Sequence, residues 1–207
     1  MKKITIEQRS PEWEQIRKTH LTGTMVKDIM GTPRVRQEAT YEAIANRLTV
    51  GVDSDEDYEN AMDRGTRLEP DAIAAFEFET GKSVEKVGFA KHDDVDGIAQ
   101  SPDGYIKDSN DTEALEIKCM GAKNHVKLWL ADDIPSEYLW QTVQYFVVNK
   151  ALQRLYFVGY NPQVPVHPLH IVEVKREDIE KLILQSEEEQ KKFLNEVNTI
   201  LSTLIKF

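Results

Sequence analysis

The 207-residue sequence predicts an α+β fold in which helices flank a mixed central sheet, forming a single domain over residues 1–207. Two observations support this. Helical periodicity dominates the N-terminal quarter, whereas residues 83–119 consist of short apolar segments separated by turn-forming Asp-Gly pairs. No glycine-rich phosphate loop is present, which argues against a doubly wound dinucleotide-binding fold. A chain of this length can bury one substantial core.

The N-terminal quarter predicts three helices. Ser10 is a suitable N-cap for a helix whose first residue is Pro11. A second helix is expected over residues 22–31, and Thr40 is expected to cap a third.

The rest of the chain alternates between helical and strand patterns. A helix carrying Glu69 is expected to end at Gly81, which suits a C-terminal stop. Residues 83–119 are then expected to form strands of one antiparallel sheet. A helix from Pro135 to about Asn149, two strands and a long amphipathic helix from Glu177 complete the prediction.

Charge and cysteine content restrict the possible ligands. The net charge is −10, and the excess lies in residues 51–116, which hold nineteen acidic and six basic residues. An acidic chain is a poor general binder of nucleic acid, unless converging carboxylates hold divalent cations. The single cysteine, Cys119, cannot form an intramolecular disulfide, and no cysteine-histidine spacing suits zinc. Any metal should therefore be held mainly by oxygen.

Neither a membrane span nor a secretory signal is predicted. No apolar run approaches the roughly 18 residues of a membrane span. The N-terminus lacks the apolar stretch of a signal peptide. We therefore expect a cytoplasmic protein with no membrane partner.

Carboxylates and a lysine form the first candidate site. Alternation along the predicted strand EALEIKC puts Glu116 and Lys118 on one face. Asp103, in Ser-Pro-Asp-Gly, precedes Glu116 by a distance that a hairpin can close. Together these groups suit Mg²⁺. Taken singly, Glu116 and Lys118 are typical of an exposed charge pair, and Ser-Pro-Asp-Gly is typical of a β-turn. A metal site and these structural roles therefore both stay open.

Two glutamines follow on a predicted helix. Gln141 and Gln144 are three residues apart and share a face beside an apolar stripe. They are either amides whose hydrogen bonds are satisfied in a core or groups that orient a water or phosphate oxygen.

These motifs, in order, resemble the phage λ exonuclease family, also called YqaJ-like viral recombinases, of the PD-(D/E)xK nuclease superfamily. The resemblance spans about residues 8 to 200 and rests on Glu69, SPDG at 101–104, LEIKC at 115–119, QTVQY at 141–145, WEQIRKTHLTGT at 13–24, GTRLEPDAIAAFEFETG at 65–81 and YNPQVPVHPLHIVEV at 160–174. It implies a restriction-endonuclease-like fold.

The resemblance also implies roles for individual residues. Asp103 and Glu116 would bind metal together with the Ile117 carbonyl, and Lys118 would orient the attacking water. Glu69 would lie near a second metal. The resemblance further assigns Gln144 to the nucleophilic water, with Gln141 as its companion. Two Mg²⁺ ions are expected in each active site, and an all-oxygen site should also accept Mn²⁺.

A second set of residues matches the family's pocket for a terminal 5′-phosphate, where a guanidinium and hydroxyls recognise the anion. The set comprises Arg17, Thr24, Ser101 and Thr22. Without the resemblance, the same residues are typical of a surface helix, helix caps and a turn.

The family resemblance implies a 5′-to-3′ exonuclease, encoded by a phage or prophage, that digests one strand of linear duplex DNA. Such an enzyme leaves 3′ overhangs for a single-strand annealing protein and works as a homotrimeric ring around the duplex. Three alternatives remain at this point: a related nuclease of different polarity, a non-catalytic protein that binds DNA ends, and an acidic protein that binds metal without turnover.

Overall fold

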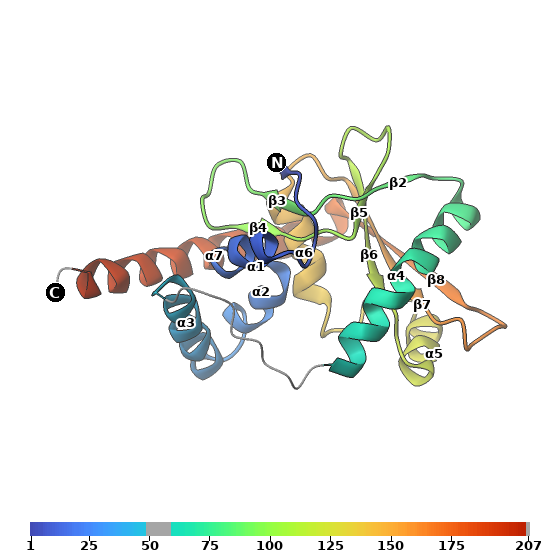
Figure 1. The fold of residues 1–207 in the computed structure, drawn as a ribbon, viewed down its shortest axis with the longest axis horizontal. Helices are drawn as coiled ribbons and strands as arrows, with labels where there is room; N and C mark the ends of the chain where they lie inside the picture. Colours follow the sequence, from blue (N-terminus) through green and yellow to red (C-terminus); the bar gives the residue numbers. More distant parts are fainter. Residues whose placement is uncertain (49–58, 206–207) are drawn as a thin grey trace.

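A five-stranded mixed sheet forms the centre of the protein, and the computed structural model describes residues 1–48 and 59–205 (Figure 1). Its strands, in spatial order, are β2 (Val84–Glu85), β5 (Gly104–Ile106), β6 (Glu113–Lys118), β7 (Arg154–Tyr160) and β8 (Leu169–Lys175). Only β6 and β7 run parallel, and the other neighbours are antiparallel. The predicted mixed α+β class is confirmed.

The central strand, β6, is covered on both faces by helices. Leu115 and Ile117 point to α4 (Glu59–Thr80), where they pack in one cluster with Phe76. The helix α6 (Leu139–Val148) lies on the opposite face from α4 (Figure 1), and the Glu116 side chain contacts Tyr145 of this helix. Because successive side chains alternate in direction, Glu116 faces α6 from within a buried strand.

A separate three-stranded sheet joins β1 (Lys2–Ile4), β3 (Phe89–Lys91) and β4 (Ala99–Gln100). The prediction of one antiparallel sheet over residues 83–119 was therefore wrong. Strands from this segment belong to two sheets because β3 pairs with the N-terminal strand β1. Phe89 of β3 packs with Trp13 in a separate apolar cluster. Gly88 permits this crossing, since a Cβ there would lie only 1.8 Å from the carbonyl oxygen of Ile6.

Helices surround the two sheets. The remaining ones are α1 (Pro11–Lys18), α2 (Gly23–Ile29), α3 (Pro33–Leu48), α5 (Ala122–Ala131) and α7 (Arg176–Leu204). The Ser10 cap is confirmed by a 3.2 Å bond from the Trp13 amide to Ser10 Oγ, and Gly81 follows the end of α4 with a φ of +68°. Within the described ranges, no helix combines the length and apolarity needed to cross a membrane.

Two helix predictions need correction, and one helix was missed. Thr40 lies inside α3, where its hydroxyl donates to the carbonyl of Arg36 at 3.0 Å instead of capping a helix. Pro135 begins a turn, closed by a 2.8 Å bond from the Tyr138 amide, so α6 starts only at Leu139. The helix α5 was not predicted.

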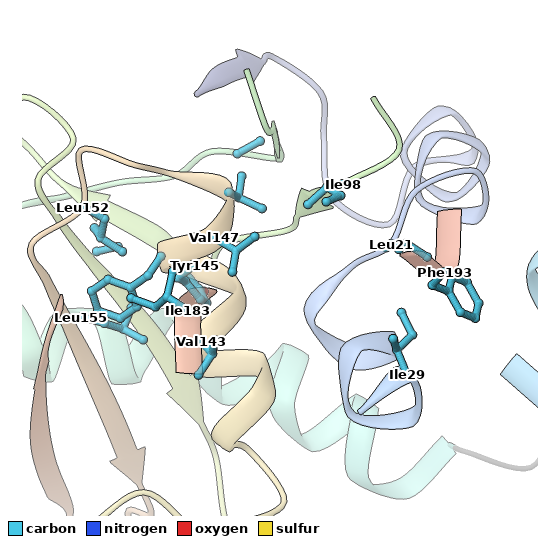
Figure 2. Packing of buried hydrophobic residues seen from close by; sticks show 14 of the residues in the cluster. Leu21, Ile29, Ile98, Val143, Tyr145, Val147, Leu152, Leu155, Ile183 and Phe193 are labelled. Carbon is cyan, nitrogen blue, oxygen red and sulfur yellow. The ribbon is translucent and has the colours of Figure 1, made fainter. Parts of the chain in front are cut away.

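The largest apolar cluster lies between α6, the sheet and α7. Figure 2 shows Tyr145 and Val143 of α6 beside Leu155 of β7 and Ile183 of α7. Further along α7, Phe193 lies beside α2, and the rest of this long helix extends away from the sheet (Figure 1). The helix α6 is therefore held from several sides.

A buried pair of amides joins α6 to α7. Gln144 and Gln190 exchange hydrogen bonds of 3.1 and 2.7 Å, and Gln190 also donates to Ser186. The Gln144 amide reaches the carbonyls of Leu21 at 3.3 Å and Ala99 at 3.0 Å. One polar cluster thus connects two helices with the segments that precede Thr22 and Ser101.

Replacing Gln190 with alanine should lower the free energy of unfolding by about 1–3 kcal/mol, because it leaves the buried Gln144 amide short of a partner. Urea unfolding followed by circular dichroism measures this. Asn198→Ala, at an exposed position of the same helix, should change stability by less than about 0.5 kcal/mol. Equal effects of the two substitutions would contradict the structural role of the amide pair.

Candidate active site

The carboxylate of Glu116, only 1% exposed, is surrounded by side-chain donors. Lys118, two residues along the same strand, and Gln141 of α6 both contact its Oε1. The Tyr145 hydroxyl donates to Oε2 at 2.5 Å. Gln141 and Tyr145 are four residues apart and so share a helix face. The orientation of this carboxylate is therefore fixed from two elements.

Asp103 joins this group from the turn between β4 and β5. Its Oδ2 accepts a 2.7 Å hydrogen bond from the Ile117 amide, and its own amide donates to the Tyr145 hydroxyl at 3.1 Å. The structure thus brings Asp103 beside Glu116 and Lys118, as the spacing of the two motifs predicted. Tyr145 contacts both acidic segments.

The electrostatics of the group favour an added cation. Burial raises the pKa of Asp103 well above its ordinary value, and the charge of Glu116 raises it further. Burial pulls the pKa of Lys118 down, but the charges of Glu116 and Asp103 outweigh burial and leave this pKa above its ordinary value. Lys118 is therefore an ammonium at neutral pH, and two carboxylates converge on that single charge.

A cavity of about 430 Å³ opens over these groups. Its lining combines four carboxylates and an ammonium with two guanidinium groups and three hydroxyls. The charged and hydroxyl residues that line it are Glu14, Glu69, Asp103, Glu116, Lys118, Arg9, Arg17, Thr24, Ser101 and Tyr138. One cavity therefore presents groups suited to a cation beside groups suited to an anion.

Glu69 enters this cavity from α4 and carries two basic partners. Its Oε1 accepts from Lys86 at 3.0 Å, and its Oε2 accepts from Arg9 at 3.4 Å. This carboxylate is therefore paired with two cationic side chains.

The residues expected to bind a phosphate lie together. Arg17 donates to the Thr24 hydroxyl at 3.2 Å, Thr24 and Thr22 hydroxyls are also 3.2 Å apart, and the guanidinium lies 4.9 Å from the Trp13 ring centre. Burial lowers the pKa of Arg17. The buried Ser101 hydroxyl has no hydrogen-bond partner among the described residues, so it is available to a ligand.

The residues expected to bind a phosphate, Arg17, Thr22, Thr24 and Ser101, are here called the anion-binding corner, and a short bridge aligns the two segments that carry them. Leu21 pairs with Ile98 in a parallel β-bridge, with bonds of 2.6 Å from the Leu21 amide to the Gly97 carbonyl and 2.9 Å from the Ala99 amide to the Leu21 carbonyl. The chain then leads to Thr22 on one side and Ser101 on the other.

Comparison with known proteins identifies the family. The model of the YqaJ-like viral recombinase domain matches residues 12–151, which extend from the second residue of α1 to beyond the end of α6. The chain belongs to the YqaJ-like viral recombinase family. The match contains every residue predicted for the site, together with both segments of the anion-binding corner. No curated protein matches the chain.

Solved structures agree with the YqaJ-like assignment. An alkaline exonuclease from Laribacter hongkongensis is 30% identical, with a TM-score of 0.83 over 95% of this chain and 97% of that one. The same exonuclease in complex with dAMP is also 30% identical, with a TM-score of 0.82 over the same shares of both chains. A phage-related exonuclease from Haemophilus somnus is 14% identical, with a TM-score of 0.57 over 89% of this chain and 96% of that one, and shows a shared fold alone.

The two predicted glutamines of this YqaJ-like chain separate. Gln141 lines the cavity and contacts Glu116, whereas Gln144 is fully buried and bonds to Gln190. The structure therefore does not place Gln144 at the cavity, and the expectation that it leads the pair needs correction. Side chains three residues apart on a helix point in directions that differ by about 60°. Here Gln141 is directed toward the sheet and Gln144 toward α7.

Sequence reasoning missed Tyr145 as a site residue. It lies beside the recognised glutamines, but its aromatic ring was counted with the apolar stripe. The spacing of four residues from Gln141 was the available signal, because it puts both side chains over the same part of β6.

The donor set of the YqaJ-like site fits a divalent cation bound by oxygen. Among the described residues, no three histidine, cysteine, aspartate or glutamate side chains are arranged to hold a metal ion. Asp103 and Glu116 nevertheless converge, and both they and Ile117 line the cavity. Hard oxygen ligands from two carboxylates suit Mg²⁺, which usually keeps several waters and needs few protein ligands.

Asp103→Asn should stabilise the metal-free protein at pH 7.5. Its folded pKa is raised, so ionising this carboxyl costs stability above the ordinary value of 3.8, and asparagine removes that cost. Thermal unfolding in EDTA should show Tm higher by about 2 °C or more, a gain that shrinks as the pH falls toward 3.8. Asp71→Asn, at an exposed position of α4, is the control. A lower Tm for Asp103→Asn would show that the buried charge is compensated.

Proposed function

We propose that the protein is a Mg²⁺-dependent 5′-to-3′ exonuclease that resects the ends of linear duplex DNA and leaves 3′ overhangs for recombination by strand annealing. The observation that carries the proposal is the shared cavity, in which Asp103, Glu116 and Lys118 lie with Arg17 and the hydroxyls of the anion-binding corner. Hydrolysis needs the two carboxylates and the lysine, whereas recognition of a DNA end needs the arginine and the hydroxyls. Membership of the YqaJ-like family and the similarity to exonucleases support it.

Asp103, Glu116 and the carbonyl of Ile117 are the groups that would hold the catalytic cation, and Glu69 would serve a second one. Bound Mg²⁺, or Mn²⁺ in its place, would activate water and stabilise the charge that develops on the phosphate. Tyr145 keeps the Glu116 carboxylate turned toward the cavity through its 2.5 Å hydrogen bond.

Lys118 and Gln141 are suited to position the attacking water. Both side chains line the cavity and both contact the same oxygen of Glu116. An ammonium held at this place favours the deprotonated form of a neighbouring water, while the amide can hold that water by a hydrogen bond. In this proposal Gln141 takes the role that the sequence had assigned to Gln144.

Arg17 is suited to bind the terminal 5′-phosphate with Thr24 and Ser101, while Thr22 holds Thr24 by its hydroxyl contact. The guanidinium carbon lies 4.9 Å from the centre of the Trp13 ring, and this cation–π contact restricts the position of the donors. The similar exonuclease from Laribacter hongkongensis has been solved in complex with dAMP, which supports a nucleotide as a ligand of this chain.

We extend the proposal to a homotrimeric ring around the duplex and to an annealing protein as partner, both supported by the family alone. A ring would reconcile the net charge of −10 with DNA binding, since only the channel needs to be basic. We also place the protein in the cytoplasm of a bacterial host, as the product of a phage or prophage.

The proposal is tested by digesting linear duplex labelled at each strand's 5′ or 3′ end, with Mg²⁺ or EDTA, beside closed circular DNA. Mg²⁺-dependent release should start from 5′ ends and leave circles intact. Lys118→Ala should reduce the rate by at least about 100-fold, because it removes the ammonium that positions water. Circular dichroism checks that this variant folds.

Three results would count against the proposal. Cutting of circles, or release from 3′ ends first, would keep a nuclease site but reject the polarity. Binding of ends without any cleavage would favour a non-catalytic end-binding protein. Normal digestion by the Lys118→Ala variant would show that the catalytic centre lies elsewhere.

Arg17→Ala should weaken the preference for 5′-phosphorylated over 5′-hydroxyl ends by about tenfold or more, since it removes a charge-assisted bond to the phosphate. The measurement is kcat/KM on both substrates. Lys18→Ala, the neighbouring cation on α1, is the matched control and should leave the ratio unchanged. The same ratio in Arg17→Ala and wild type would reject the end-binding pocket.

A further inference from the structure

Arg9 adopts a backbone conformation that its side chain does not favour. It lies in the turn between β1 and α1 with a φ of +67°, in the left-handed region that glycine adopts without strain. A residue held in such a conformation at a cavity is a reason to look for a function of its side chain. Arg9 lies before the residues matched by the family model, which begin at 12.

The backbone around Arg9 is anchored on both sides. Gln8 donates to the carbonyl of Pro102 at 2.8 Å, in the turn that carries Asp103. Ser10 caps α1 through its bond with the Trp13 amide. The Arg9 side chain lines the cavity between these two anchored neighbours.

The contact that Arg9 makes is weak. Its guanidinium reaches Glu69 Oε2 at 3.4 Å, the only hydrogen bond of this side chain to the described part of the chain, and the side chain is 45% exposed. A guanidinium has five donors, so most of its capacity is available. Glu69 retains Lys86 on its other oxygen, at 3.0 Å, if Arg9 leaves.

A second cation, Arg17, lines the same cavity as Arg9. The pKa of Arg17 is lowered mainly by burial. The charge of Glu14 raises this pKa and the charge of Arg9 lowers it, so the two guanidinium groups affect each other. Two like charges at one cavity are stabilised by an anion that binds both. Arg9 thus interacts with an acidic group on one side and a basic group on the other.

We propose that Arg9 exchanges partners during substrate binding. It pairs with Glu69 while no metal is present, and it turns to a phosphate group of the DNA when a divalent cation takes Glu69. Arg9 then acts as a substrate-binding residue as well as a competitor of the metal. This inference rests on the proposed nuclease function.

The test compares Arg9→Gln and Lys86→Gln, which each remove one cationic partner of Glu69. Calorimetric titration with Mn²⁺ in the absence of DNA should show binding about two- to fivefold tighter in both variants. Affinity for duplex ends is then measured in the presence of Mn²⁺, in a Lys118→Ala background that prevents digestion. Arg9→Gln should weaken DNA binding about tenfold and lower its salt dependence by about one counterion, whereas Lys86→Gln should change neither.

Opposite effects of Arg9→Gln on metal and on DNA support the exchange. It is overturned if Arg9→Gln leaves DNA affinity unchanged, if it weakens Mn²⁺ binding, or if Lys86→Gln weakens DNA binding equally. Arg9→Gly, which suits the backbone conformation, should reproduce Arg9→Gln without lowering Tm and so excludes misfolding. Failure of the nuclease proposal would appear in the wild type, as absent digestion.

Arg9 could bind either the terminal 5′-phosphate or the scissile phosphodiester, and DNA with 5′-phosphorylated or 5′-hydroxyl ends distinguishes the two. A contact with the terminal phosphate predicts that Arg9→Gln loses affinity only for 5′-phosphorylated ends. A contact with the scissile phosphodiester predicts an equal loss for phosphorylated and hydroxyl ends. Both results support partner exchange, and they differ only in which phosphate Arg9 binds.

Discussion

The carboxylate of Glu116 is held at the middle of the central strand by donors from the same strand and from α6. A charge buried this deeply is tolerated only when it is paired and hydrogen-bonded. Tyr145 supplies one bond and also accepts the amide of Asp103. The packing of α6 against β6 therefore determines where both acidic groups lie. The anion-binding corner lies beside them at the same cavity.

The smaller sheet is the second support of the site. Its strand β4 leads into the turn that carries Ser101 and Asp103, and the bridge between Leu21 and Ile98 aligns this turn with the start of α2. Gln144, which pairs with Gln190, donates hydrogen bonds to the carbonyls of Leu21 and Ala99 and so holds the same two segments. The prediction that residues 83–119 form one sheet missed this arrangement, which brings the anion-binding residues to the edge of the carboxylate group.

The site is expensive in stability, which is characteristic of functional residues. Burial raises the pKa of Asp103, so its ionised form is disfavoured until a cation arrives. Arg9 keeps an arginine in a backbone conformation that favours glycine. In the proposed function, a divalent cation and DNA would supply opposite charges at these positions.

Local patterns in the sequence determined much of the protein. The Ser10 cap, the stop at Gly81 and the shared face of Glu116 and Lys118 depend on neighbours a few residues away, and the family motifs follow the same order along the chain. Tertiary structure alone decided that Thr40 lies inside a helix, that Gln141 and not Gln144 reaches the cavity, that Tyr145 holds both acidic segments, and that Arg9 pairs with Glu69. These contacts join residues distant in sequence, and a helical or strand period states which side chains share a direction but not what lies opposite them.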